Sequence, residues 1–219
     1  MEFHSHTPWK IWGLDFLPDL CSVARMDNYN WAKTFGDHFA DALDAYRAGK
    51  RSAEAMFTPA AREFLKSIGA TAQEVFDFVE DTFHGGDPGA ETALLVTAAR
   101  RDYFLVVQKG KHSPHRIDMD ALPSKGAELA GIEWLPRLIE KAKAKLRGEM
   151  PPDLMYCCGG DRAFLREHNI QPADFLREAW AAGDDHQRIV EYVRQAAADK
   201  PANLPPVVCQ ILPGGRVKC

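Results

Sequence analysis

Short amphipathic segments, each opened by a capping residue and closed by a helix-breaking one, dominate the sequence from Trp31 to Asp199. In such a segment the apolar residues recur every three or four positions and so lie on one side of a helix. The first segment shows the pattern with Trp31, Phe35, Phe39, Ala42, Leu43 and Tyr46. Gly49 closes it, as a glycine commonly does after the last helical turn. The repeated pattern predicts an all-α protein.

Capping residues fix where several further helices begin. Thr58 precedes Pro59, a residue suited to the first helical position, and Thr71 with Glu74 forms a capping-box pattern. Asp161 is a candidate cap for a later helix. Further helices are predicted over 90–101 and 134–146, from Pro172, and from Asp184. The apolar run 103–108 is compatible either with a helix extension or with a strand.

Proline, glycine and aromatic residues divide the chain into five parts. Residues 1–30 form an aromatic N-terminal arm, and 31–108 a helical half. Residues 109–123, with Gly110, Pro114 and Pro123, form a linker. A second helical half covers 124–199, and a Pro-rich extended tail covers 200–219, with a short strand considered at 207–212. The two halves are expected to pack together.

The two halves align with an offset of 100 residues. Ala61 to Phe76 matches Asp161 to Leu176, pairing Arg62 with Arg162 and Leu65 with Leu165. Gly69 and Asn169, both suited to a left-handed helix end, fall at the same place. We therefore predict a duplicated module whose first copy is degenerate.

Composition excludes several classes of protein. The net charge of −4 gives no basic surface for nucleic acid, and no stretch approaches the roughly 20 apolar residues of a membrane helix. The first residues lack a signal-peptide pattern. Five irregularly spaced cysteines fit reduced thiols better than disulfides. A cytoplasmic protein is expected, without nucleic-acid or membrane partners.

A string of residues in the second half carries a family resemblance. Ser124 to Gly148 contains a Leu-Ala-Gly segment that leads into a Leu-Pro-Arg helix with an acidic-Lys pair. Tyr156, a cysteine, Asp161 and then Phe-Leu follow. This pattern resembles the bacterial domain-of-unknown-function family numbered 5069, over about residues 120–199. The resemblance implies an all-helical fold and no established activity, and this chain departs from it in its doubled cysteine and its Gly-Gly.

The candidate site gathers around residues 156–161. Arg137 and Lys141 are four apart and share a helix face. Cys158 directly precedes a helix N-terminus, where partial positive charge lowers a thiol pKa, and Gly159-Gly160 offers backbone N–H groups to an anion. Arg137 would clamp a carboxylate-bearing small molecule and Cys158 would act as nucleophile or acid-base group. The remaining catalytic candidates are Lys141, Tyr156 and Asp161.

Structural roles compete with each of these assignments. Arg137, Glu140 and Lys141 also fit a solvated helix face with a salt bridge, and Asp161 a plain N-cap. Cys157 and Cys158 also fit buried small hydrophobic residues. A metal site remains an alternative, for which the candidate ligands are His4, His6, His84, His112 and His115.

The sequence favours a cofactor-independent cytoplasmic enzyme. It would act on a small anionic or aromatic compound by acid-base or thiol chemistry, as a lyase, isomerase or hydrolase. The first alternative is a non-catalytic protein that binds a small molecule or forms an oligomeric scaffold, with the aromatic arm as a dimer contact. The second alternative is a His-ligated metalloprotein.

Overall fold

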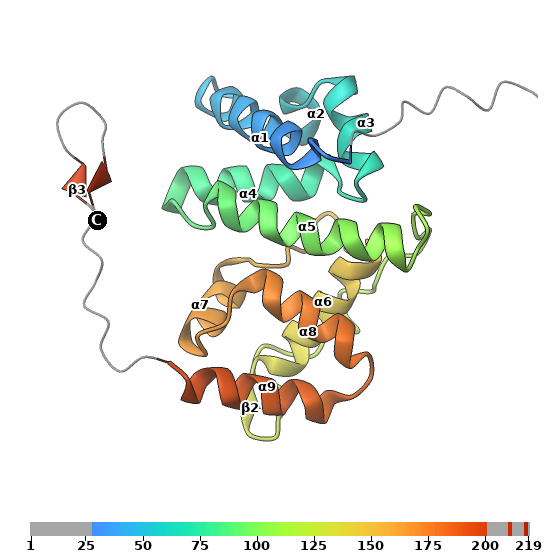
Figure 1. Ribbon diagram of the computed structural model, residues 1–219, viewed down its shortest axis with the longest axis vertical. Coiled ribbons are helices and arrows are strands. Elements are labelled where there is room, and N and C mark those ends of the chain that lie inside the picture. Colours follow the sequence, from blue (N-terminus) through green and yellow to red (C-terminus); the bar gives the residue numbers. More distant parts are fainter. Residues whose placement is uncertain (1–27, 201–209, 212–216, 219) are drawn as a thin grey trace, which may run out of the picture.

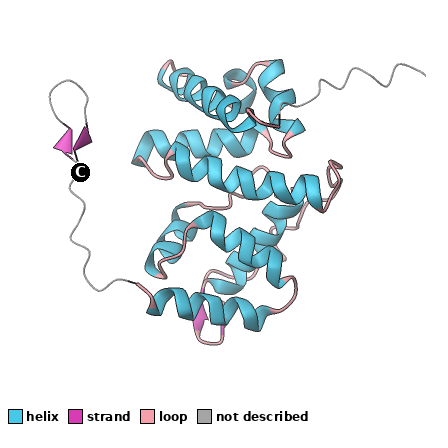
Figure 2. Cartoon of the chain, viewed as in Figure 1, coloured by secondary structure: helices cyan, strands magenta, loops and turns pink. Residues whose placement is uncertain are grey.

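The fold is described from a computed structural model that covers residues 28–200, 210–211 and 217–218. Helices make up most of it, which confirms the all-α prediction (Figure 2). The helices are α1 (Trp31–Arg47), α2 (Ala53–Met56), α3 (Pro59–Ser67), α4 (Ala72–Gly85), α5 (Ala90–Val106), α6 (Leu135–Arg147), α7 (Gly159–Glu167), α8 (Pro172–Ala182) and α9 (His186–Ala198). The predicted aromatic arm lies almost wholly outside the described residues.

The helices stack in successive layers along the long axis (Figure 1). At one end α1 lies with the short α2 and α3, and it packs against α4. The central helix α5 packs against α1 and α4 on one side and against α6 and α8 on the other. The helix α9 covers α8 at the opposite end. Thus α5 is the element that joins the two predicted halves.

Thr58 and Thr71 cap their helices as predicted, whereas the last helix is capped by Asp185, one residue after the predicted Asp184. The Thr58 hydroxyl accepts from the Ala61 amide at 3.2 Å, with Pro59 at the first helical position. Thr71 and Glu74 form the predicted capping box, with reciprocal bonds of 2.9 and 3.2 Å. Each bond satisfies an amide that has no partner within its helix. The run 103–108 extends α5 as far as Val106, so it is mostly helix.

The few strands are short. β1 (Glu128–Leu129) and β2 (Ile132–Glu133) pair antiparallel, with Leu129 opposite Ile132. Ala130 and Gly131 form the turn between them, both with positive φ, which matches the twist of a two-residue hairpin. β3 (Gln210–Ile211) pairs with β4 (Val217–Lys218) in the tail. β3 lies within the segment 207–212 that was considered for a strand, and β4 lies beyond it.

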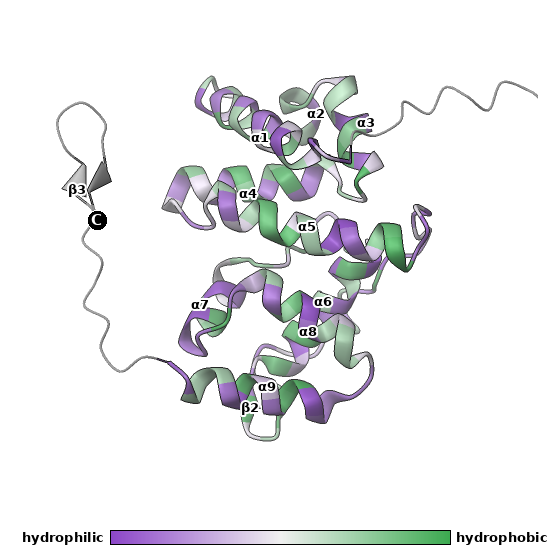
Figure 3. Cartoon of the chain, viewed as in Figure 1, coloured by the Kyte–Doolittle hydropathy of each residue, from purple (hydrophilic) through white to green (hydrophobic). Residues whose placement is uncertain are grey.

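The helices carry both hydrophobic and hydrophilic residues (Figure 3), and the buried hydrophobic residues pack against one another. Leu65, Val79, Leu138 and Leu176 are all fully buried, and they come from both halves. The buried residues form one continuous cluster. The two halves therefore share a hydrophobic core.

Ion pairs cross the seam between the halves. Glu74 on α4 meets Lys145 on α6 at 2.9 Å, and the Lys145 side chain is 3% exposed. Arg162 on α7 binds Asp81 at the end of α4 at 2.7 Å. Asp87, in the α4–α5 loop, lies 3.1 Å from Arg162. Polar contacts therefore fix how the second half sits on the first.

The backbone repeats in the two halves. α3 and α7 begin 100 residues apart, at Pro59 and Gly159, and have equal length. Gly69 and Asn169 both adopt left-handed conformations after them. The pattern includes side chains, because Arg62 donates to the backbone carbonyl five residues earlier at 3.0 Å and Arg162 does the same at 2.6 Å. These matches support the hypothesis that the two halves arose by duplication, which stays a prediction.

Candidate functional site

A buried ion pair lies between α6 and α7. The Lys141 ammonium contacts Oδ2 of Asp161, and the two side chains are 2% and 0% exposed. Burying two charges costs several kcal/mol per ion unless further hydrogen bonds satisfy them. The alternative interpretation of Lys141 as part of a solvated helix face is wrong, because Lys141 lies among the buried residues of α6.

Two further donors hold the Asp161 carboxylate. Oδ1 accepts from the Trp134 indole nitrogen at 3.0 Å, and Oδ2 accepts from the Cys157 backbone amide at 2.9 Å. Asp161 is the third residue of α7, and Cys158 is the N-cap, so Asp161 as a plain N-cap is wrong. Three donors converge on one carboxylate, so both of its oxygens have partners although the side chain is fully buried.

Cys158 lies at the N-terminus of α7, half-buried and free. The Lys141 ammonium donates to its Sγ at 3.2 Å. The first backbone amides of a helix have no partner within it and carry partial positive charge. Cys158 Sγ therefore lies beside the Lys141 ammonium, which also pairs with the Asp161 carboxylate, and beside the first backbone amides of α7.

Trp134 was not predicted as a site residue, yet its indole binds the carboxylate of this cluster. It precedes α6 with φ of +69°, a conformation rarely adopted by bulky residues. Its ring lies so close to Gly160 that a Cβ there would come within 2.6 Å of Cζ2. Gly160 was predicted to offer its amide to an anion, and the structure shows in addition that its lack of a side chain admits the indole.

Neighbouring cysteines have opposite environments. Cys157 is fully buried, and desolvation raises the pKa of its thiol to about 12. Its φ is +68°, which turns the chain sharply before α7. Cys157 fits the predicted buried hydrophobic role, whereas Cys158 has the polar surroundings that a reactive thiol requires.

Two predicted site residues lie apart from the cluster in their contacts. The Arg137 guanidinium donates to the Pro123 carbonyl at 2.8 Å. The Tyr156 hydroxyl donates to the Pro172 carbonyl at 2.8 Å, and burial raises the pKa of the hydroxyl well above its usual value. Both side chains hold loops in place. The structure thus joins Lys141, Cys158 and Asp161, with Gly159 and Gly160 opening α7 beside them.

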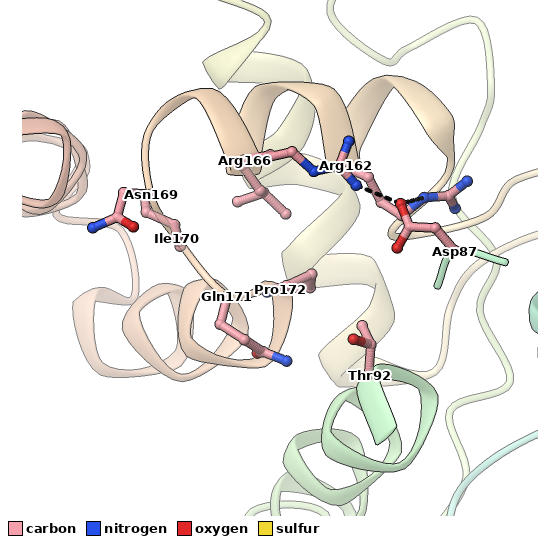
Figure 4. A pocket seen from close by; sticks show the side chains of 9 residues that line it. Asp87, Thr92, Arg162, Arg166, Asn169, Ile170, Gln171 and Pro172 are labelled. Carbon is pink, nitrogen blue, oxygen red and sulfur yellow. Dashed lines mark hydrogen bonds and ion pairs between the residues drawn. The ribbon is translucent and has the colours of Figure 1, made fainter. Parts of the chain in front are cut away.

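Two pockets flank α7. The seam pocket, of about 360 Å³, lies between α7, the start of α8 and the first half of the chain (Figure 4). The hairpin pocket, of about 510 Å³, lies between α7 and the β1–β2 hairpin, and Trp134 and Gly160 line it. The sequence predicted a pocket at the junction of the halves without its lining residues, which come from segments far apart in the chain.

Histidine ligation of a metal finds no support in the described part of the chain. Within it, no three His, Cys, Asp or Glu side chains group closely enough to hold an ion. His84 contacts the Tyr46 hydroxyl at 3.0 Å, and His112 contacts the Lys66 carbonyl at 3.0 Å. His4 and His6 lie outside the described residues.

Comparison with known proteins finds a family match in the second half of the chain. Residues 120–204 match the model of DUF5069, a domain of unknown function, which confirms the resemblance. The matched region contains the whole Lys141 cluster, which consists of Trp134, Lys141, Cys158 and Asp161. No curated protein and no solved structure matches the chain. Among the described helices, none is both long and apolar enough to cross a membrane.

Proposed function

We propose that the protein is a cofactor-independent cytoplasmic enzyme that acts on a small anionic or aromatic compound through the thiol of Cys158. The observation that carries the proposal is the 3.2 Å contact between the Lys141 ammonium and Cys158 Sγ at the N-terminus of α7. A thiolate is the nucleophilic form of cysteine, and a neighbouring cation and a helix N-terminus both favour it. A reducing compartment keeps such a thiol free.

Each member of the cluster has a distinct role in this proposal. Cys158 is the nucleophile, and Lys141 stabilises its thiolate. Asp161 holds Lys141 in place, and it is a positioning residue because three donors already occupy its oxygens. The backbone amides of Gly159 and Gly160 supply partial positive charge for an oxyanion.

Acyl transfer is the chemistry that these groups serve best. The thiol proton passes to water, and the thiolate attacks the carbonyl carbon of an ester or amide. The bond to the leaving group then breaks, the leaving alcohol or amine takes a proton from water as it departs, and a thioester remains on Cys158. Water hydrolyses the thioester, releases the acid and regenerates the thiol. A hydrolase is therefore the preferred member of the lyase, isomerase and hydrolase set.

Para-nitrophenyl acetate tests the proposal as a generic acyl donor. The full chain should release a burst of nitrophenolate of about one equivalent, the signature of an accumulating acyl-enzyme. Peptide mass spectrometry should locate the acetyl group on Cys158. Cys158→Ser should remove both the burst and the adduct.

Cys157→Ser is the matched control, because it changes the adjacent cysteine, whose thiol is buried and has a raised pKa. It should retain the burst. Acetylation that spreads evenly over the cysteines, or a burst that survives Cys158→Ser, would refute the thiol enzyme.

A non-catalytic binding protein is the second candidate. The seam and hairpin pockets are lined by residues other than Cys158, which favours binding without chemistry at the thiol. In that case the acyl donor gives no burst, and small molecules still bind to the intact chain. The same experiment therefore separates the two functions.

A further inference from the structure

The seam pocket is built by both halves of the chain. Asp87 and Thr92 line it from the α4–α5 loop and the start of α5, and Arg162, Arg166 and Gln171 line it from α7 and the start of α8. Figure 4 shows these side chains around one hollow, with Asp87 between the two arginines. A ligand in this pocket would touch both halves at once.

Hydrogen-bond donors outnumber acceptors in the lining. Arg162 and Arg166 lie on successive turns of α7 and both face Asp87. A single oxygen of Asp87, Oδ2, accepts a hydrogen bond from Arg166 Nη2 at 2.6 Å and forms an ion pair with Arg162 Nε at 3.1 Å. Asp87 is the one carboxylate among the lining residues. The native pairing therefore already shows that this wall of the pocket binds a carboxylate.

The two arginines differ in exposure and in how firmly other residues hold them. Arg162 is 14% exposed and is also held by Asp81 and the Cys157 carbonyl, so it is fixed in place. Arg166 is 69% exposed, and its bond to Asp87 involves one of its three nitrogens. A guanidinium carries five N–H donors in a planar fork that matches carboxylate and phosphate. Arg166 is thus the group that can receive a ligand.

Further donors lie across the hollow. The Gln171 side-chain oxygen accepts from the Ala173 amide, so its NH₂ group is the end left for the pocket, as Figure 4 shows. Thr92 adds a hydroxyl from the opposite wall. An acceptor-rich ligand would find donors on both sides of the hollow.

We propose that the seam pocket binds a small oxyanion, a carboxylate or a phosphate, which takes the place of Asp87 on Arg166 and bridges the two halves. The Asp87 side chain is 44% exposed and can turn to water at little cost, because ion pairs between exposed side chains contribute little to stability. Exchange of one carboxylate for another predicts modest affinity, with a Kd on the order of 1 mM. This inference stands independently of chemistry at Cys158.

Thermal unfolding and calorimetric titration of the full chain test the proposal. The probes are succinate and inorganic phosphate, with neutral succinamide as control, all at one ionic strength. Succinate or phosphate should raise the melting temperature saturably, because a ligand that binds the folded state stabilises it. Binding of one anion alone identifies the chemical source of the ligand, and both results support the site.

Three variants locate the binding. Arg166→Ala should weaken binding of the anion about tenfold, because the variant loses the charge-assisted hydrogen bonds of the exposed guanidinium. Arg177→Ala, at an exposed arginine on α8 outside the pocket, should leave binding unchanged. Asp87→Asn should tighten binding, because it removes the competing carboxylate.

Three results would overturn the proposal. The first is no saturable binding of either anion to the wild-type chain at about ten times the expected Kd. The second is equal binding of succinamide. The third is Arg166→Ala and Asp87→Asn variants that both bind like wild type.

Discussion

Lys141 and Asp161 form an ion pair whose side chains are 2% and 0% exposed, between two helices of the same half. Loss of one partner leaves the other charge buried alone. We therefore expect Asp161→Asn to lower the free energy of unfolding by about 3–5 kcal/mol. Urea denaturation followed by circular dichroism measures the change. Asp174→Asn, at an exposed pair on α8, should change stability by less than about 0.5 kcal/mol. Equal losses in the two variants would contradict this account.

Lys141 should control the reactivity of Cys158. In Lys141→Met the sulfur loses its charged donor, and alkylation of Cys158 by iodoacetamide at pH 7 should slow roughly tenfold. Lys145→Met is the matched control, since Lys145 is equally buried on α6 and paired with Glu74. The alkylation rate is followed by mass spectrometry of the peptide that contains Cys158. Each variant is measured under conditions in which it is folded. A similar slowing in both variants would show that general destabilisation is the cause.

Gly160 and Gly159 should differ sharply in their tolerance of a methyl group. In Gly160→Ala the new Cβ would lie 2.6 Å from Trp134, so the indole must shift from Asp161, at an expected cost of about 1–3 kcal/mol. In Gly159→Ala the nearest atom is an Arg162 nitrogen at 4.0 Å, so the change should be nearly neutral. Urea denaturation of the pair tests the contact, and a neutral Gly160→Ala would rule it out.

Asp77 should make the protein less stable as the pH rises. Burial raises the pKa of this carboxyl from 3.8 to about 6. The folded state then binds more protons than the unfolded state between these values, so stability falls as pH rises from about 4 to 6. Asp77→Asn should remove this slope and raise stability at pH 7 by about 1 kcal/mol, after discount for its partial exposure.

The charged neighbours of Asp77 set the control for that measurement. Glu74 and Glu80 lie on the same helix, and Lys145 faces it from α6. Burial alone would raise the pKa of Glu74, but Lys145 outweighs it and lowers this pKa, so Glu74 loses its stabilising contribution on acidification. The difference between wild type and Asp77→Asn isolates Asp77. A difference that does not change with pH would contradict the raised pKa.

The helices were predictable because their signals are local. Thr71 and Glu74 lie one turn apart, so their reciprocal bonds are visible in the sequence itself. Gly69 and Asn169 likewise mark helix ends by their own backbone preferences. Cys158 instead of Asp161 as the N-cap of α7 shows the limit of such signals. Asp161 accepts from an amide four residues earlier instead, a choice fixed by its buried partners.

The site was predictable only in part because its contacts are long-range. Lys141 and Cys158 were singled out by charge and helix position, and the fold brings them together. Nothing local marks Trp134 as the partner of Asp161, since the contact depends on the left-handed turn before α6 and on Gly160. Arg137 and Lys141 share a helix, yet Arg137 reaches a loop carbonyl while Lys141 reaches α7.

The two candidate binding regions differ in how much of the chain they require. Every member of the Lys141 cluster lies between Trp134 and Asp161, inside the region 120–204 that matches the family. The seam pocket also needs Asp87 and Thr92, which lie outside that region. The cluster around Lys141 is therefore built wholly by the matched half, whereas a ligand in the seam pocket would make its binding depend on the first half as well.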